Sequence, residues 1–212
     1  MHIILASSSP RRRDLLSLLQ IPFTVVDPEC DEYIDEDLSP REFVVQMARQ
    51  KVRAVGTQFP EALILGGDTI IELNGEILGK PRHADDAVIM LKKLAGTTHH
   101  VHTGIALFRT IAQVMTSAIE TVQVSMKPLT DLELEAYLTT GEGLGKAGGY
   151  CIQGMGADLI TTIKGDYPAV VGFPLRKVAA LLEQAGMTLP LSIEDIYHRT
   201  PYPNWEKFTT CS

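Results

Sequence analysis

The sequence has few cysteines and no long apolar run, and these absences exclude several protein classes. The cysteines at positions 30, 151 and 211 form no Cys-x-x-Cys pair, which argues against a zinc knuckle or a thioredoxin-type site. Their odd number, and a start without a basic segment before an apolar run, predict reduced thiols and a cytoplasmic protein. No segment approaches the roughly 20 apolar residues of a membrane span. We therefore expect no membrane attachment.

Positive charge is also scarce in this sequence. The 19 Lys and Arg residues face 26 Asp and Glu residues, which gives a net charge of -7 and a pI near 5.3. Because no basic tract is present, we expect no nucleic-acid partner. A local cluster of cations would have to hold any anionic substrate. The 212 residues, 45% of them hydrophobic, suffice for one domain or one domain with two lobes.

The segment from Leu63 to Lys80 combines apolar residues with opposite charges. An apolar run reaches two glycines and then Asp68, where we expect the strand to end. A turn at Asn74-Gly75 predicts a hairpin that returns Lys80 towards Asp68. A carboxylate beside a cation suits phosphate chemistry on a metal-bound substrate. The alternatives are an aspartate that caps a turn and a solvated lysine.

A second candidate anion site lies near the N-terminus. Residues 2–6 predict a buried strand, and a helix is expected from Pro10 to about Gln20, after the loop that starts at Ser7. Free N–H groups at a helix N-terminus attract anions. Arg11 and Arg12 oppose the helix dipole there, which a bound anion would explain. The alternative is a capped helix with surface arginines.

The remaining chain predicts an α/β fold with a mixed twisted sheet, flanking helices and two lobes around a cleft. Capping-box patterns begin two of its helices, at Ser39 and Thr130, and Lys51 is expected beside the apolar face of the first. From residue 190 we expect an extended tail. The other strands are predicted at 22–26, 97–108, 112–126 and 150–163, and helices at 85–95 and 174–184.

Three further patterns favour structural interpretations. The Gly-x-Gly-x-x-Gly run at 143–148 lies between a helix and a strand, the wrong order for a dinucleotide fold. The P-loop-like run at 75–81 is one residue short and has proline where a Ser or Thr would hold magnesium. His100 and His102 would share one strand face and His99 the other, which favours a polar strand face over a metal site.

Several charged residues would together suit a nucleoside triphosphate with its metal ion. Cations bind the phosphate chain, while acids hold a divalent metal and activate a water. Oxygen ligands alone favour Mg²⁺ or Mn²⁺ over zinc. The candidates are Arg11, Arg12, Glu32, Lys51, Asp68 and Lys80.

The order of the motifs resembles the Maf family of nucleotide pyrophosphatases, from about Ile3 to about Gly186. We expect one Maf-like domain over residues 1–189 and a C-terminal tail over 190–212. The segments that carry the resemblance are 5–12, Ala48-Arg-Gln-Lys51, Gly67-Asp68-Thr69-Ile70, Gly79-Lys80-Pro81, 146–154 and 165–174.

The resemblance implies a Maf/ITPase-like α/β fold with a deep cleft and metal-dependent hydrolysis of nucleoside triphosphates to the monophosphate and pyrophosphate. It implies a divalent cation, Mg²⁺ or Mn²⁺, and suggests a homodimer. Asp68 matches the catalytic acid, the proton acceptor for water, and Glu32 would hold the metal with it. The other phosphate- and metal-site positions match Ser7, Arg11, Arg12, Lys51 and Lys80.

The choice of nucleotide is predicted from three positions. Arg12, Thr69 and Gln153 match the subfamily that acts on dTTP and UTP, and the Gln153 amide can donate to and accept from a pyrimidine. Gly145 departs from the aspartate that the family often has, which would shift metal binding to Glu32 and Asp68. The alternatives are a non-catalytic nucleotide-binding regulator of cell division and a pyrophosphatase of the same fold for purine or methylated GTP substrates.

Overall fold

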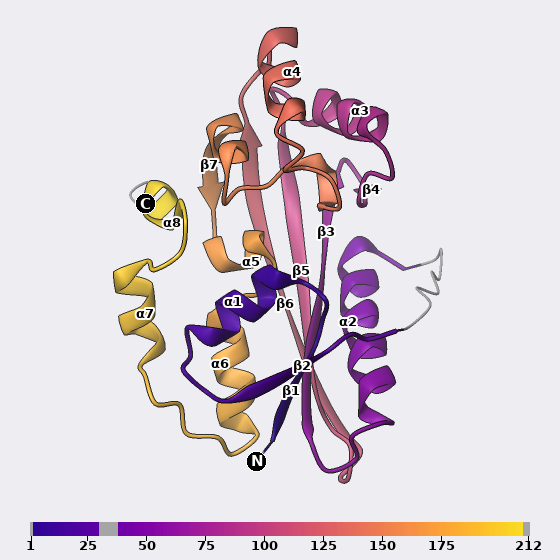
Figure 1. Cartoon of the computed structure of the whole chain (residues 1–212), viewed down its shortest axis with the longest axis vertical. Helices are drawn as coiled ribbons and strands as arrows, with labels where there is room; N and C mark the ends of the chain where they lie inside the picture. Colours follow the sequence, from indigo (N-terminus) through magenta and orange to yellow (C-terminus); the bar gives the residue numbers. More distant parts are fainter. Residues whose placement is uncertain (1, 30–37, 210–212) are drawn as a thin grey trace. The chain divides into compact units, whose positions relative to one another are not determined.

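The computed structural model describes residues 2–29 and 38–209, and helices and strands alternate in its first part (Figure 1). The strands are β1 (Ile3–Ala6), β2 (Phe23–Val26), β3 (Leu63–Leu73), β4 (Glu76–Leu78), β5 (Thr98–Arg109), β6 (Val114–Met126) and β7 (Ile160–Lys164). The α-helices are α1 (Pro10–Ser17), α2 (Pro40–Gly56), α3 (Ala84–Leu94), α4 (Asp131–Thr139), α5 (Tyr167–Val171), α6 (Leu175–Gln184), α7 (Ile193–Arg199) and α8 (Trp205–Thr209). Two 3₁₀ turns are η1 (Ala147–Gly149) and η2 (Met155–Leu159).

The strands form one mixed sheet in the order β2-β1-β3-β5-β6-β7, with β4 paired to β3. β1 pairs in parallel with both β2 and β3. β4 runs antiparallel to β3, and β7 runs antiparallel to β6. The predicted mixed sheet with flanking helices is therefore confirmed. None of the helices in the described ranges has the length and apolar character that a bilayer crossing needs.

The chain divides into two compact units. The first contains Met1–Thr69, Thr103–Glu120 and Gly172–Arg199, and the second contains Ile70–His102, Thr121–Val171 and Thr200–Ser212. The long strands β3, β5 and β6 contribute residues to both units.

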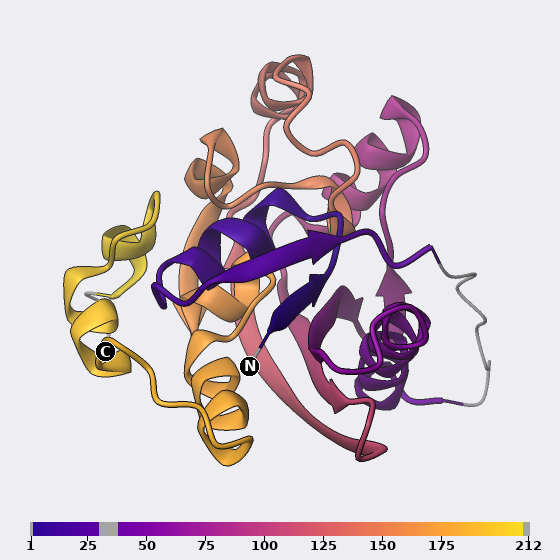
Figure 2. The ribbon, with the colours of Figure 1, turned by 60° about the horizontal axis from the view of Figure 1, so that its bottom comes forward.

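In the first unit, helices cover both faces of the sheet. Figures 1 and 2 show α2 on one face and α1 and α6 on the other. Ile4 and Ile64 pack against Val52 of α2, while the alternating neighbour Leu5 points to the opposite face and is also fully buried. Burial on both faces explains why β1 and the start of β3 are continuous apolar runs.

The predicted strand end at Asp68 is wrong, because β3 continues through Leu73. The two preceding glycines instead allow close packing. A Cβ atom at Gly66 would lie 2.8 Å from Val52 Cγ1 on α2, and one at Gly67 would lie 2.9 Å from the Gly104 carbonyl oxygen. The glycines therefore bring α2 and β5 close to β3 beside Asp68.

The second unit contains the turn of the predicted hairpin, and Asn74 and Gly75 there have φ values of 53° and 87°.

Two predictions for the C-terminal part of the chain are wrong. Of the strand expected at 150–163, only residues 160–163 belong to a strand, β7, because η1 and η2 shape the glycine-rich segment before it. The tail is not extended along its described length, since it contains α7 and α8. The buried Trp205 of α8 stacks on Tyr167 and anchors the tail.

Candidate functional site

An ion pair between α2 and β3 forms the centre of the candidate site. Lys51 Nζ lies 2.6 Å from Asp68 Oδ1, and the two side chains are only 12% and 14% exposed. The packing of Val52 against Gly66 fixes the distance between the two elements that carry this pair. A charge-assisted hydrogen bond at this distance holds the carboxylate in a defined orientation while part of it stays open to a ligand.

Arg12 of α1 is held beside this pair by groups far away in the sequence. Its Nε donates to the Gly172 carbonyl oxygen at 2.9 Å, and its Nη2 donates to Thr69 Oγ1 at 3.0 Å. Burial lowers the pKa of Arg12 from its usual 12.5 to about 10, an effect that the charge of Asp68 opposes and that of Arg11 reinforces. The guanidinium therefore keeps its charge at neutral pH in a fixed position.

Ser7 joins Arg12 to the loop before α1. Its buried hydroxyl accepts a hydrogen bond from the Ser9 N–H at 3.1 Å, and Arg12 Nη1 lies 3.5 Å away. Ser9 is the N-cap residue of α1, but its side chain makes no capping hydrogen bond. Pro10 occupies the start of the helix, as predicted. This arrangement suits a phosphate group, because the helix dipole and Arg12 both favour negative charge here.

Thr69 connects Arg12 to a residue that the sequence did not single out. Its Oγ1 is 3.0 Å from Thr103 Oγ1, and Thr103 is fully buried. Gly172 has a φ of 121°, and a Cβ atom there would lie 3.2 Å from Thr69 Oγ1. Gly172 lies within a family-like motif, but no local signal identifies its carbonyl, or the hydroxyl of Thr103, as a partner of this network.

The structure thus brings together Ser7, Arg12, Lys51, Asp68 and Thr69 within the first unit. Lys80 and Gln153 belong to the second unit. Lys80 is exposed just beyond β4, and Gln153 lies between η1 and η2. Glu32 lies outside the described residues. The roles of these residues stay predictions.

The histidines of β5 take the faces that the sequence predicts. Glu72 Oε2 lies 3.1 Å from His100 Nδ1 and 3.6 Å from His102 Nε2, while His99 contacts Tyr150 Oη at 2.8 Å. A hydrogen bond from the Gly75 N–H is the largest cause that lowers the pKa of Glu72, and the hydrogen bond with His100 lowers it further. Across the residues that the structure describes, no group of three His, Cys, Asp or Glu side chains could hold a metal ion. A polar strand face remains the better interpretation.

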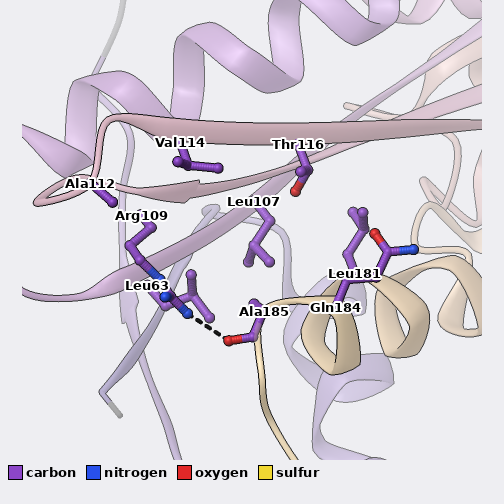
Figure 3. A pocket seen from close by; sticks show the side chains of 9 residues that line it. All are labelled: Leu63, Leu107, Arg109, Ala112, Val114, Thr116, Leu181, Gln184 and Ala185. Atoms are coloured by element: carbon purple, nitrogen blue, oxygen red, sulfur yellow. Dashed lines mark hydrogen bonds between the residues drawn. The ribbon is translucent and has the colours of Figure 1, made fainter.

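A separate hollow of about 160 Å³ lies in the first unit between the β5–β6 hairpin and α6 (Figure 3). Its lining is mainly apolar and includes Leu107 and Leu181. Arg109 donates through Nη2 to the Ala185 carbonyl oxygen at 2.5 Å, which satisfies a carbonyl at the C-terminal end of α6. This hydrogen bond gives Arg109 a structural role.

Comparison with known proteins gives consistent matches. The family described as Maf-like protein matches residues 2–185. The dTTP/UTP pyrophosphatase of Symbiobacterium thermophilum is 46% identical over 185 residues, which cover 87% of this chain and 94% of the relative. The protein of the same name from Halalkalibacterium halodurans is 46% identical over 186 residues, which cover 88% of this chain and 97% of the relative. The structure of the Staphylococcus aureus Ham1 protein, 17% identical, covers 87% of this chain and 100% of its own with a TM-score of 0.51, and it supports the fold.

Proposed function

The chain belongs to the Maf family, and we propose that it hydrolyses dTTP and UTP to the nucleoside monophosphate and pyrophosphate. The names of the relatives that are 46% identical support the reaction and the substrates. The structural observation that carries the proposal is the Lys51–Asp68 pair beside the half-buried Arg12. An acid among cations can accept a proton while the cations bind phosphate oxygens.

In the proposed reaction, a water attacks the α-phosphorus and its proton passes to Asp68. A bond forms between the water oxygen and the α-phosphorus, the bond to the bridging oxygen breaks, and pyrophosphate leaves. Lys51 holds Asp68 through one N–H, and its positive charge attracts the phosphate oxygens. Arg12 and Ser7 bind a second part of the phosphate chain, and Arg11 and Lys80 add positive charge.

The residues present fit a divalent cation whose coordination the substrate completes. Mg²⁺ binds through one or two carboxylates together with phosphate oxygens and waters, and it does not need a cage of protein ligands. Asp68 supplies one partly exposed carboxylate, and we propose Glu32 as the second. When bound, Mg²⁺ or Mn²⁺ would neutralise phosphate charge and lower the pKa of the attacking water.

We assign the choice of nucleotide to Gln153, Thr69 and Arg12, and we give these residues different roles. Thr69 uses its hydroxyl on Arg12 and Thr103, so its part is to set the position of the guanidinium. Gln153 carries the amide that would recognise the pyrimidine edge.

The proposal is tested by incubating the purified protein with dTTP, UTP, dCTP, dATP, GTP and methylated GTP in Mg²⁺ or Mn²⁺. Pyrophosphate and the monophosphate are measured for each nucleotide. We expect the highest kcat/KM for dTTP and UTP. Preference for a purine would overturn the substrate assignment but not the reaction. Nucleotide binding without pyrophosphate release would favour the regulatory alternative instead.

A further inference from the structure

A short C-terminal segment, residues 200–209, forms hydrogen bonds with the loop that carries Gln153. Asn204 Nδ2 donates to the carbonyl oxygens of Ile152 at 3.0 Å and Gly154 at 3.2 Å. These two residues flank Gln153 on either side. The side chain of Asn204 therefore fixes the backbone on both sides of the proposed base-recognition residue.

The segment is itself firmly anchored in the second unit. Trp205 is 3% exposed and stacks on Tyr167, with ring centroids 5.9 Å apart. The Tyr167 hydroxyl also donates to the Pro203 carbonyl oxygen. Lys207 pairs with Asp158 at 2.8 Å. These contacts give the segment the rigidity that a positioning element requires.

The Gln153 amide is held at both of its polar atoms. Its Nε2 donates to Tyr202 Oη at 2.6 Å, and the Cys151 thiol donates to its Oε1 with an S···O distance of 3.7 Å. Cys151 is placed in turn by its N–H, which donates to Tyr137 Oη at 2.9 Å. One N–H and one lone pair of the amide stay available for a ligand. A hydroxyl and a thiol can each donate or accept, so these two contacts fix the position of the amide, with Nε2 towards Tyr202 and Oε1 towards Cys151.

We propose that Tyr202 is a positioning residue that makes Gln153 selective for thymine and uracil over cytosine. This inference rests on the proposed function. Thymine and uracil present an N3–H donor beside the O4 acceptor, whereas cytosine presents an N3 acceptor beside the N4 donor. An amide that rotates freely can match either pattern, whereas an amide engaged at both Nε2 and Oε1 presents its remaining N–H and lone pair in fixed directions. The family match ends at residue 185, so Tyr202 and Asn204 lie beyond the matched region, whereas Gln153 lies within it.

Tyr202→Phe tests the proposal, because it removes the hydroxyl and keeps the ring. The measured quantity is the ratio of kcat/KM for dTTP to kcat/KM for dCTP. Loss of one hydrogen bond that holds the amide in place should lower this ratio about tenfold. Tyr197→Phe is the matched control, since its hydroxyl contacts the Arg176 N–H within the first unit. The control should keep the wild-type ratio.

A double-mutant cycle separates positioning from general damage. In a Gln153→Ala background, Tyr202→Phe should leave the ratio unchanged, because Tyr202 acts through the Gln153 amide. Equal losses of kcat/KM for both nucleotides in Tyr202→Phe would indicate a merely structural role and overturn the inference. An unchanged ratio in Tyr202→Phe, beside a selective wild-type enzyme, would overturn it while the proposed function stands. A wild-type protein that hydrolyses neither dTTP nor UTP would overturn both.

Discussion

At the scale of single residues, Asp68 is distinguished by its surroundings. It lies within β3, is almost buried, and receives a hydrogen bond from Lys51. Glu76, on the same hairpin, is paired with Lys93 at 2.6 Å, but that pair is half-exposed. Two acid–lysine pairs with the same distance therefore differ in burial, and only the buried one lies beside Arg12 and the loop before α1.

Asp68→Asn should lower kcat by at least about 100-fold, because the amide cannot accept the proton of the attacking water. The fold should persist, since the amide oxygen can still accept from Lys51. Steady-state kinetics with dTTP and the far-UV circular dichroism spectrum check the two parts. Glu76→Gln is the control and should keep wild-type kinetics. Activity near the wild-type level in Asp68→Asn would dismiss Asp68 as the base.

His99 gives a prediction about stability and pH. It is fully buried beside Tyr150, and burial first, then the charge of His100, lowers its pKa from 6.5 to about 4. Between about pH 4 and pH 6.5, His99 binds a proton more readily in the unfolded chain than in the folded chain. The contribution of His99 to the free energy of unfolding is complete above about pH 6.5 and falls as the pH approaches 4, by roughly 3 kcal/mol in total.

Replacing His99 with Gln, which keeps a partner for Tyr150, should flatten this part of the pH profile. Urea denaturation at several values between about pH 4 and pH 7 measures it. His2→Gln, at an exposed histidine, should keep the wild-type slope. If His99→Gln and the wild type lose stability in parallel, His99 is not the titrating group.

At the scale of elements, local signals predicted those elements that local interactions determine. The capping boxes at Ser39 and Thr130 are both present in the structure, and the Asn74-Gly75 hairpin forms as expected. The Gly66-Gly67 pair wrongly predicts a strand end, because a glycine needed for close packing looks the same in sequence as one needed for a turn.

The candidate site shows the same limit. The sequence groups Lys51 with Asp68 by their charges and by family-like motifs, and the structure places the two side chains in contact. Thr103 and Tyr202 act through partners 34 and 49 residues away, and no periodic pattern predicts such contacts. The prediction of an extended tail fails for the same reason, because Trp205 stacks on Tyr167, a residue distant in the sequence.

Trp205→Ala should therefore destabilise the second unit by about 3–5 kcal/mol, the usual cost of removing a buried aromatic side chain. Chemical denaturation, followed by circular dichroism, measures the loss. Leu132→Ala is the control, because Leu132 is 76% exposed and its truncation should change stability by less than about 0.5 kcal/mol. A loss in Trp205→Ala as small as in the control would show that α8 contributes little to the unit.

At the scale of the whole molecule, the charge balance predicts that substrate binding depends on a metal ion. The protein carries a net charge of -7, and a bare triphosphate would bring further negative charge to Asp68. Arg12 and Lys51 offset this repulsion in part, but Lys51 already neutralises Asp68. A divalent cation shared by Asp68 and the phosphates would convert the repulsion into attraction.

Ligand-induced thermal stabilisation should consequently require the metal. A non-hydrolysable α,β-imido analogue of dTTP, at about 100 times its Kd with Mg²⁺, should stabilise the fold by about 2.7 kcal/mol and raise Tm by several degrees. The shift should nearly vanish in EDTA, because the analogue then binds against the charge of Asp68. In Asp68→Asn the shift should depend much less on Mg²⁺, since the carboxylate that both attracts the cation and repels the phosphates is gone. Equal shifts of the wild-type protein with Mg²⁺ and with EDTA would contradict a metal held between Asp68 and the substrate.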